Sequence, residues 1–174
     1  MNPLRHGGFS LLEVLIAIVI VSLGLLGNAA IHLRGLKDGN AAFQQNQAAN
    51  LAHEMADRLR ANLQGVRDGE YDDLSGIPEG DVSNCANTVC SPAELAQYDL
   101  SQWNNALAAT LPVGQGTVCR RLPTAASCAG TGDTFVITVR WDAARSGATG
   151  TGCDRGNSDD LHCQYLVVSP GVNP

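Results

Sequence analysis

The feature that most constrains this chain is an uncharged apolar run near its N-terminus. Val14 to Leu26 reads VLIAIVIVSLGLL. Together with the largely apolar stretches on either side, Phe9 to Leu12 and Ala29 to Ile31, it approaches the roughly 20 residues that span a bilayer. The flank ahead of the run carries Arg5 and no acid, so the positive-inside rule predicts a cytoplasmic N-terminus. The sequence therefore predicts a single membrane span at about 9–31, with the rest of the chain outside the cytoplasm.

One acid, Glu13, stands at the start of this run, and two glycines precede Phe9. A charge deep in a bilayer costs about 2.5 kcal/mol or more, so an acid there needs a reason. An ordinary secretory signal is cut after its apolar region, whereas here the small residues stand before it. Two interpretations follow: a simple membrane anchor with a tolerated interfacial acid, or a processing signal followed by a functional acid.

The stretch HGGFSLLEVL resembles the class III signal of type IV pilins and related pseudopilins. In that family a short basic leader ends in Gly, the next residue is usually Phe, and Glu is the fifth residue of the mature chain; Gly8, Phe9 and Glu13 stand at these positions. The resemblance implies that prepilin peptidase removes residues 1–8 and that the new amine of Phe9 is methylated. It also implies that Glu13 acts in assembly, because a neighbouring subunit's Phe9 ammonium would neutralise it at only one axial offset.

The helical pattern continues beyond the apolar run, since no proline occurs between Leu4 and Ile77. Apolar residues recur at steps of three and four, with charged residues elsewhere on the wheel. The apolar set is Ala48, Leu51, Ala52, Met55, Leu59, Leu63 and Val66. We therefore expect one helix over 9–66, about 87 Å long if continuous. Because each glycine costs about 1 kcal/mol relative to alanine, we expect bends or local melting at GLLGN and LRGLKDGN.

The segment LAHEMADRLRAN, Leu51 to Asn62, together with SLGLLGNAA, is similar to PilV-type minor pilins of type IVa pili. This resemblance implies a minor pilin that helps to prime pilus assembly and enters the pilus at or near its tip. The implied partners are the other minor pilins, the major pilin, prepilin peptidase and the inner-membrane assembly machinery. The implied location is the inner membrane with a periplasmic head, and then the surface pilus.

Two alternatives to this function remain open at this stage. A minor pseudopilin of a type II secretion system shares the N-terminal motif. An adhesive or DNA-uptake subunit at the pilus tip is the other alternative. The chain has 11 Lys+Arg against 17 Asp+Glu, and this acidic balance disfavours nucleic acid as a partner.

The cysteines all lie beyond the apolar run, and their even number without a CxxC pair predicts disulfides in an oxidising compartment. They are Cys85, Cys90, Cys119, Cys128, Cys153 and Cys163. The spacing of the first two suits a small disulfide loop; a zinc site is the alternative, disfavoured by the export signal and the lack of a nearby His. Sequential order favours pairing the third with the fourth and the fifth with the sixth, although fifteen connectivities exist.

Residues 67–174 are predicted to form a periplasmic globular head. It opens with an acidic, Gly-containing linker at 67–81. Ser91 and Glu94 form a capping box for a helix at about 92–110, whose apolar stripe Asp99 interrupts. Alternating apolar residues predict antiparallel strands, at about 117–122, 134–141 and 164–169.

The predicted fold class is therefore α+β. A long N-terminal helix, membrane-spanning in its first half and amphipathic in its second, packs against a small antiparallel β-sheet head with disulfides. Its first half is expected to lie in the membrane and its second half against the sheet.

Two groups of polar residues in the head are candidates for a metal site or a catalytic site. Residues 152–163 offer hard oxygen ligands for Ca²⁺ but lack the spacing of an EF-hand loop, and Asp, Asn and Gly are ordinary turn residues. His162 with Asp159 or Asp160 and a serine would suit a hydrolase, but no GxSxG motif supports one. We therefore expect no enzymatic activity, no metal and no cofactor.

Overall fold

The computed structural model describes residues 10–76, 78, 81–122 and 128–171. The predicted leader, with Gly8, and the following Phe9 lie outside these residues. The chain divides into two compact units, residues 1–42 and 43–174. The elements are α1 (Leu11–Ala61), α2 (Leu63–Arg67), β1 (Asp73–Ser75), α3 (Pro92–Thr110), β2 (Gln115–Arg120), β3 (Phe135–Trp141) and β4 (His162–Val168).

The first unit contains the N-terminal part of α1, which is helical without interruption. The helix passes through Gly24, Gly27, Gly35 and Gly39, and a Cβ at any of them would meet nothing within 4 Å. The helix is continuous through these glycines, so the local melting expected there is not seen in the structure. Among the described residues, α1 is the one helix long and apolar enough to cross a membrane.

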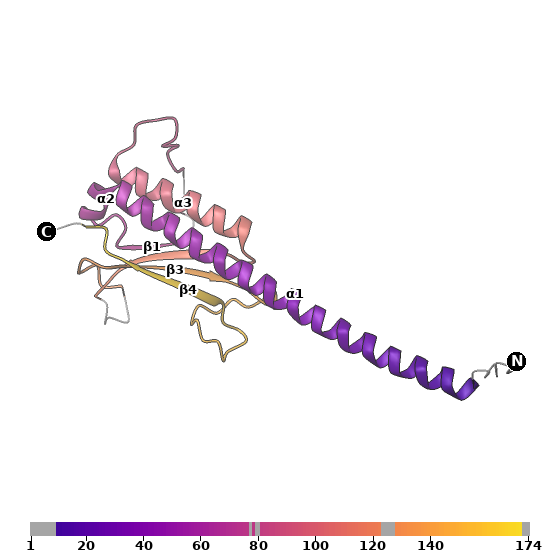
Figure 1. Ribbon diagram of the computed structural model, residues 1–174. Coiled ribbons are helices and arrows are strands. Elements are labelled where there is room, and N and C mark those ends of the chain that lie inside the picture. The colour runs from indigo at the N-terminus through magenta and orange to yellow at the C-terminus, as the bar shows by residue number, and fades with distance from the viewer. Residues whose placement is uncertain (1–9, 77, 79–80, 123–127, 172–174) are drawn as a thin grey trace, which may run out of the picture. The chain divides into compact units, whose positions relative to one another are not determined.

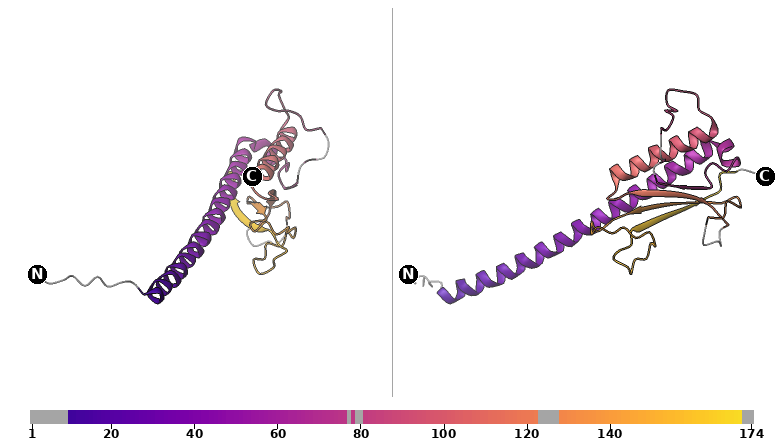
Figure 2. Two further views of the ribbon diagram at one scale, coloured as in Figure 1. Left: turned by 90° about the vertical axis from the view of Figure 1, so that its right-hand side faces the viewer. Right: turned by 180° about the vertical axis from the view of Figure 1, so that it is seen from behind.

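The second unit is a two-layer α+β head. Figures 1 and 2 show α3 beside the C-terminal part of α1, with both on the same side of the strands. The four strands form one antiparallel sheet in the order β1-β2-β3-β4. Three of them lie where strands were predicted, each within about two residues of the expected bounds. The fold class is therefore the predicted α+β arrangement.

The fourth strand, β1, was not predicted, because its three residues lie in the segment interpreted as a linker. Asp73 pairs with Cys119, and Ser75 pairs with Thr117. A strand this short shows no readable alternation, so only pairing with β2 identifies it.

The first helix ends at Ala61, so the expected single helix to Val66 is wrong over its last turn. Asn62 has a non-helical backbone (φ −114°, ψ 59°), and its side-chain oxygen accepts a hydrogen bond from the Gly65 backbone N at 3.1 Å, capping α2. Its side-chain NH₂ donates to the Pro92 carbonyl at 2.8 Å. Buried contacts to a distant segment thus decide where the helix stops, and a local pattern cannot show them.

The helix α3 begins at the capping box that the sequence predicts. The Ser91 hydroxyl accepts a hydrogen bond from the backbone N of Glu94, and the Glu94 carboxylate accepts one from the backbone N of Ser91. Asp99, which interrupts the apolar stripe of this helix in the sequence, lies buried within the helix. A buried acid needs hydrogen-bond or ion-pair partners.

The core lies between the helices and the sheet. Six of the seven residues in the predicted apolar stripe of the first helix are buried, and Leu63 is partly exposed. Trp103 and Trp141 are almost fully buried, and their indole N–H groups donate to the Leu51 carbonyl at 2.8 Å and to the Gln44 side chain at 3.0 Å. Both large side chains are therefore buried without an unsatisfied donor.

Candidate functional site

The first candidate site is the N-terminal end of α1. Its apolar side chains are exposed on all sides of the helix between Leu11 and Leu26. A helix that is apolar all round is a membrane span or is buried in an assembly, because water does not favour such a surface. This end of the helix therefore suits membrane anchoring before assembly.

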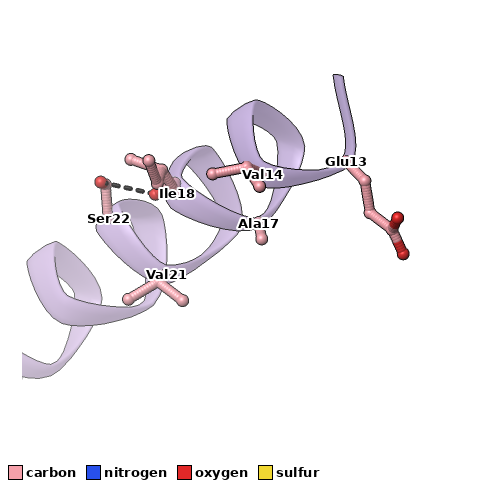
Figure 3. A pocket seen from close by; sticks show the side chains of 6 residues that line it. All are labelled: Glu13, Val14, Ala17, Ile18, Val21 and Ser22. Carbon is pink, nitrogen blue, oxygen red and sulfur yellow. Dashed lines mark hydrogen bonds between the residues drawn. The ribbon is translucent and has the colours of Figure 1, made fainter. Parts of the chain in front are cut away.

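Glu13 is the one acid in the first turn of this helix. It borders a shallow hollow whose other lining residues are small or apolar apart from Ser22; they are Val14, Ala17, Ile18, Val21 and Ser22. Figure 3 shows the Glu13 side chain projecting away from the helix, while the Ser22 hydroxyl donates to the Ile18 carbonyl at 2.7 Å. Within the described residues the Glu13 carboxylate has no ion-pair partner, so any partner for it must come from elsewhere.

Sequence reasoning missed a buried polar network in the head. Arg58 donates to one Asp99 oxygen at 3.0 Å, and Tyr71 donates to the other at 2.7 Å. Asn62 donates to the Tyr71 oxygen at 3.1 Å, and Glu54 accepts from Arg58 at 2.7 Å. These bonds join the first helix, α3 and the segment before β1, so the network is structural. An acid inside the apolar stripe of α3 was the available signal.

The network also fixes protonation states. Burial and the hydrogen bond to Asp99 raise the pKa of Tyr71 well above its ordinary value, so its hydroxyl keeps its proton. Burial lowers the pKa of Arg58, but the hydrogen bonds to Glu54 and Asp99 outweigh burial and raise it. The guanidinium therefore stays charged opposite the buried carboxylate.

The cysteines pair in sequential order: Cys85–Cys90, Cys119–Cys128 and Cys153–Cys163. All six thiols are thus consumed, which excludes the zinc site considered at the first pair. The expectation of a disulfide-containing head is confirmed.

The acidic segment 152–163 is built as a set of turns. Asp154 accepts from the Gly156 backbone N at 2.8 Å, and Asp160 accepts from the Asp154 backbone N at 3.0 Å. Across the described ranges, no three His, Cys, Asp or Glu side chains gather as metal ligands. The carboxylates here hold the loop, as the turn interpretation predicted.

His162 does not join a catalytic group in the part of the chain that the structure describes. Its ring lies against Trp141, with centroids 5.9 Å apart, and no hydrogen bond links it to Asp159 or Asp160. The arrangement required for a hydrolase is not formed by these residues.

An exposed apolar N-terminal helix, a sheet packed on the helical layer and a disulfide-containing head fit an α+β pilin fold. Residues 30–101 match the Tt1218-like family, described as type IV pilin Tt1218, and residues 4–27 match the prokaryotic N-terminal methylation motif. The second range contains Gly8, Phe9 and Glu13. No curated protein and no solved structure matched the chain.

Part of the chain is thus similar to a type IV pilin, and the stretch before it matches an N-terminal methylation motif. Such a motif implies interaction with the peptidase and with pilus assembly machinery in general. The matched family is structural, not enzymatic.

Proposed function

We propose that this protein is a minor pilin that helps to prime type IV pilus assembly and is incorporated at or near the pilus tip. The observation that carries the proposal is Glu13, an acid without an ion-pair partner in the described chain, at the start of an apolar helix within the methylation motif. A second subunit's Phe9 ammonium would supply the missing charge. The leader, residues 1–8, is removed first.

The minor-pilin assignment is supported by the segment Leu51 to Asn62, which lies within the matched pilin region. In the structure this segment packs against the head, with Leu51, Met55 and Leu59 buried, so these residues also have a packing role. The proposed partners are other minor pilins, the major pilin and the inner-membrane assembly machinery.

A type II secretion pseudopilin is the second candidate, since it shares the N-terminal motif. The match to a type IV pilin model favours the pilus. Affinity purification of the protein from membranes distinguishes the two: minor pilins in the eluate support the proposal, and secretion pseudopilins in their place contradict it.

The substitution Glu13→Gln tests the assembly role. It keeps the shape of the side chain, removes the charge and leaves membrane insertion as easy or easier. We expect normal cleavage, accumulation in the inner membrane, weaker association with other minor pilins, and fewer surface pili that are not proportionately shorter. Immunoblots of membrane and sheared-pilus fractions, with pili counted by electron microscopy, measure this.

Asp38→Asn is the matched control, because Asp38 is an exposed acid on the same helix. It should assemble as the wild type does. Normal partner binding and wild-type piliation in the Glu13→Gln strain would show that Glu13 does not set the register of assembly.

A further inference from the structure

A polar hollow of about 350 Å³ lies on the face of the sheet opposite the helices. On β3 the residues Phe135, Ile137, Val139 and Trp141 belong to the face in contact with the helices, so Thr138 and Arg140 point to the other side. Thr117, Thr138 and Tyr165 form a row across β2, β3 and β4, because Thr138 is the direct partner of both others. Three strands therefore build the floor of the hollow.

Two disulfides form part of its wall. Cys119, Cys128 and Cys153 line the hollow, and they belong to the bridges Cys119–Cys128 and Cys153–Cys163. In Figure 1 the loop that follows β3 lies on the side of the sheet away from the helices. A covalently closed rim keeps the side chains in place before any ligand arrives, which reduces the entropy lost on binding.

The hollow contains cationic side chains in an acidic chain. Arg140 lines it at one end of the β2–β3 ladder, where it pairs with Gln115, and Arg121 lines it beyond the other end. None of the described residues that line the hollow is Asp or Glu, although the chain has a net charge of −6. The Arg140 side chain donates to the Thr117 hydroxyl at 3.2 Å, which orients the guanidinium. A guanidinium carries five N–H donors in a planar fork suited to carboxylate, sulfate or phosphate groups.

The remaining lining groups suit a polyhydroxylated ligand. Thr117, Thr138 and Thr151 contribute hydroxyls that both donate and accept hydrogen bonds. Tyr165 is 50% exposed and presents an aromatic ring against which the C–H face of a sugar can pack. A simple anion would use the arginines and leave the ring and most hydroxyls without a role.

We propose that this hollow binds an acidic saccharide, with the carboxylate or sulfate at Arg140 and the sugar ring against Tyr165. The site belongs to the head alone and uses no residue of the N-terminal motif. If the saccharide proposal fails, the proposed pilus function is therefore unaffected. If the pilus function fails, the saccharide proposal is likewise unaffected.

The test is calorimetric titration of the full chain in a polyoxyethylene detergent, since a sugar-based detergent would compete. The probes are glucuronate and glucose 6-sulfate, with glucose, acetate and inorganic phosphate as comparisons at constant ionic strength. At least one of the two acidic sugars should bind about tenfold or more tightly than any of the three comparison compounds, because only it engages both the charge and the ring. Arg140→Gln and Tyr165→Ala should each weaken that binding about tenfold.

Arg67→Gln is the matched control, because Arg67 is an exposed arginine in α2, outside the hollow. It should leave the affinity unchanged. If acetate or phosphate binds as tightly as the acidic sugars, the hollow is a general anion site and the saccharide proposal is wrong. Absence of binding by both acidic sugars, or unchanged affinity in a folded Arg140→Gln variant, would overturn the proposal. Should Arg140→Gln fail to fold, the exposed Tyr165→Ala variant decides.

Discussion

Gly116 is a position where β2 packs closely against α3. A Cβ built there would lie 2.2 Å from two ring atoms of Trp103 and 2.7 Å from Leu107. The backbone N of Gly116 also donates to the Asn104 side chain at 2.9 Å, so the strand cannot move away without losing that bond.

We therefore predict that Gly116→Ala lowers the free energy of unfolding by about 1–3 kcal/mol. The measurement is urea unfolding of the full chain in detergent, followed by the fluorescence of its two tryptophans, both of which lie in the second unit. Gly39→Ala is the control, because a Cβ there meets nothing within 4 Å; it should not destabilise the head. Equal stability of Gly116→Ala and wild type would refute the close packing.

Asp142 gives the head a defined response to acid. It is buried after β3, and its carboxylate accepts from the backbone N of Gly147 at 2.8 Å and of Ser146 at 3.1 Å. Burial alone would raise the pKa of Asp142, but these hydrogen bonds outweigh it and lower the pKa below its ordinary value of 3.8. Its stabilising contribution is thus complete above the ordinary pKa and is lost as pH falls through the lowered one.

The corresponding prediction concerns the urea midpoint below about pH 4. Asp142→Asn should lower the midpoint at pH 7 and show a smaller further loss on acidification than the wild type. Asp159→Asn, at an exposed carboxylate with no side-chain hydrogen bond in the described structure, should follow the wild-type curve. If acidification lowers the urea midpoint of Asp142→Asn as much as that of the wild type, this account is contradicted.

At the residue scale, the sequence predicts local interactions well and distant ones poorly. The capping box of Ser91 and Glu94 lies within four residues and was predicted correctly. The hydrogen bonds of Asp99 and Asn62 were not predicted, because their partners Arg58, Tyr71 and Pro92 come from other parts of the chain. Only the folded chain brings those groups within hydrogen-bond distance.

Among the elements, the joint between the first helix, α3 and the segment before β1 depends on Tyr71. Its hydroxyl is fully buried, donates to Asp99 and accepts from Asn62. Removing this oxygen leaves two buried polar groups each short of a hydrogen bond. The cost of such a loss is about 1–3 kcal/mol.

Tyr71→Phe should therefore destabilise the head by about that amount in the same urea assay. Tyr98→Phe is the control on α3, since Tyr98 is only partly buried and makes no side-chain hydrogen bond among the described residues. If both variants unfold at the wild-type midpoint, the network does not hold the elements together.

Element prediction succeeded where the period was long enough to read. The strand β3 shows seven residues of alternation and was placed within one residue, whereas β1 has three residues and was missed. The hollow proposed as a saccharide site was also missed, because Thr117, Thr138 and Tyr165 come from three different strands. Only the pairing of β2, β3 and β4 places these side chains in one row.

For the whole molecule, we propose that removal of the leader is the first processing step after synthesis. Gly8→Val places a branched side chain at the proposed cleavage site. The variant should remain as a precursor heavier than the mature chain by the eight-residue leader MNPLRHGG. Intact-mass measurement of the purified membrane form detects this difference.

The wild-type protein provides the companion measurement. Its mature N-terminus should be a methylated Phe9, as the matched methylation motif implies. Ser10→Ala, next to the proposed cut but not part of the motif's Gly–Phe pair, should be processed normally. A mature chain that begins at any other residue would remove the basis for the assembly role of Glu13.

The three disulfides join residues only 5, 9 and 10 positions apart, so each closes a loop within a local segment and none ties a helix to the sheet. If the chain is pulled at its two ends, the bridges keep only these three short loops from extending. The load would fall instead on the antiparallel ladder of β2, β3 and β4 and on the hydrogen bonds of Trp103 and Trp141 to the first helix. A pulled head should therefore open with nearly the contour length of a reduced chain, by rupture of noncovalent contacts alone.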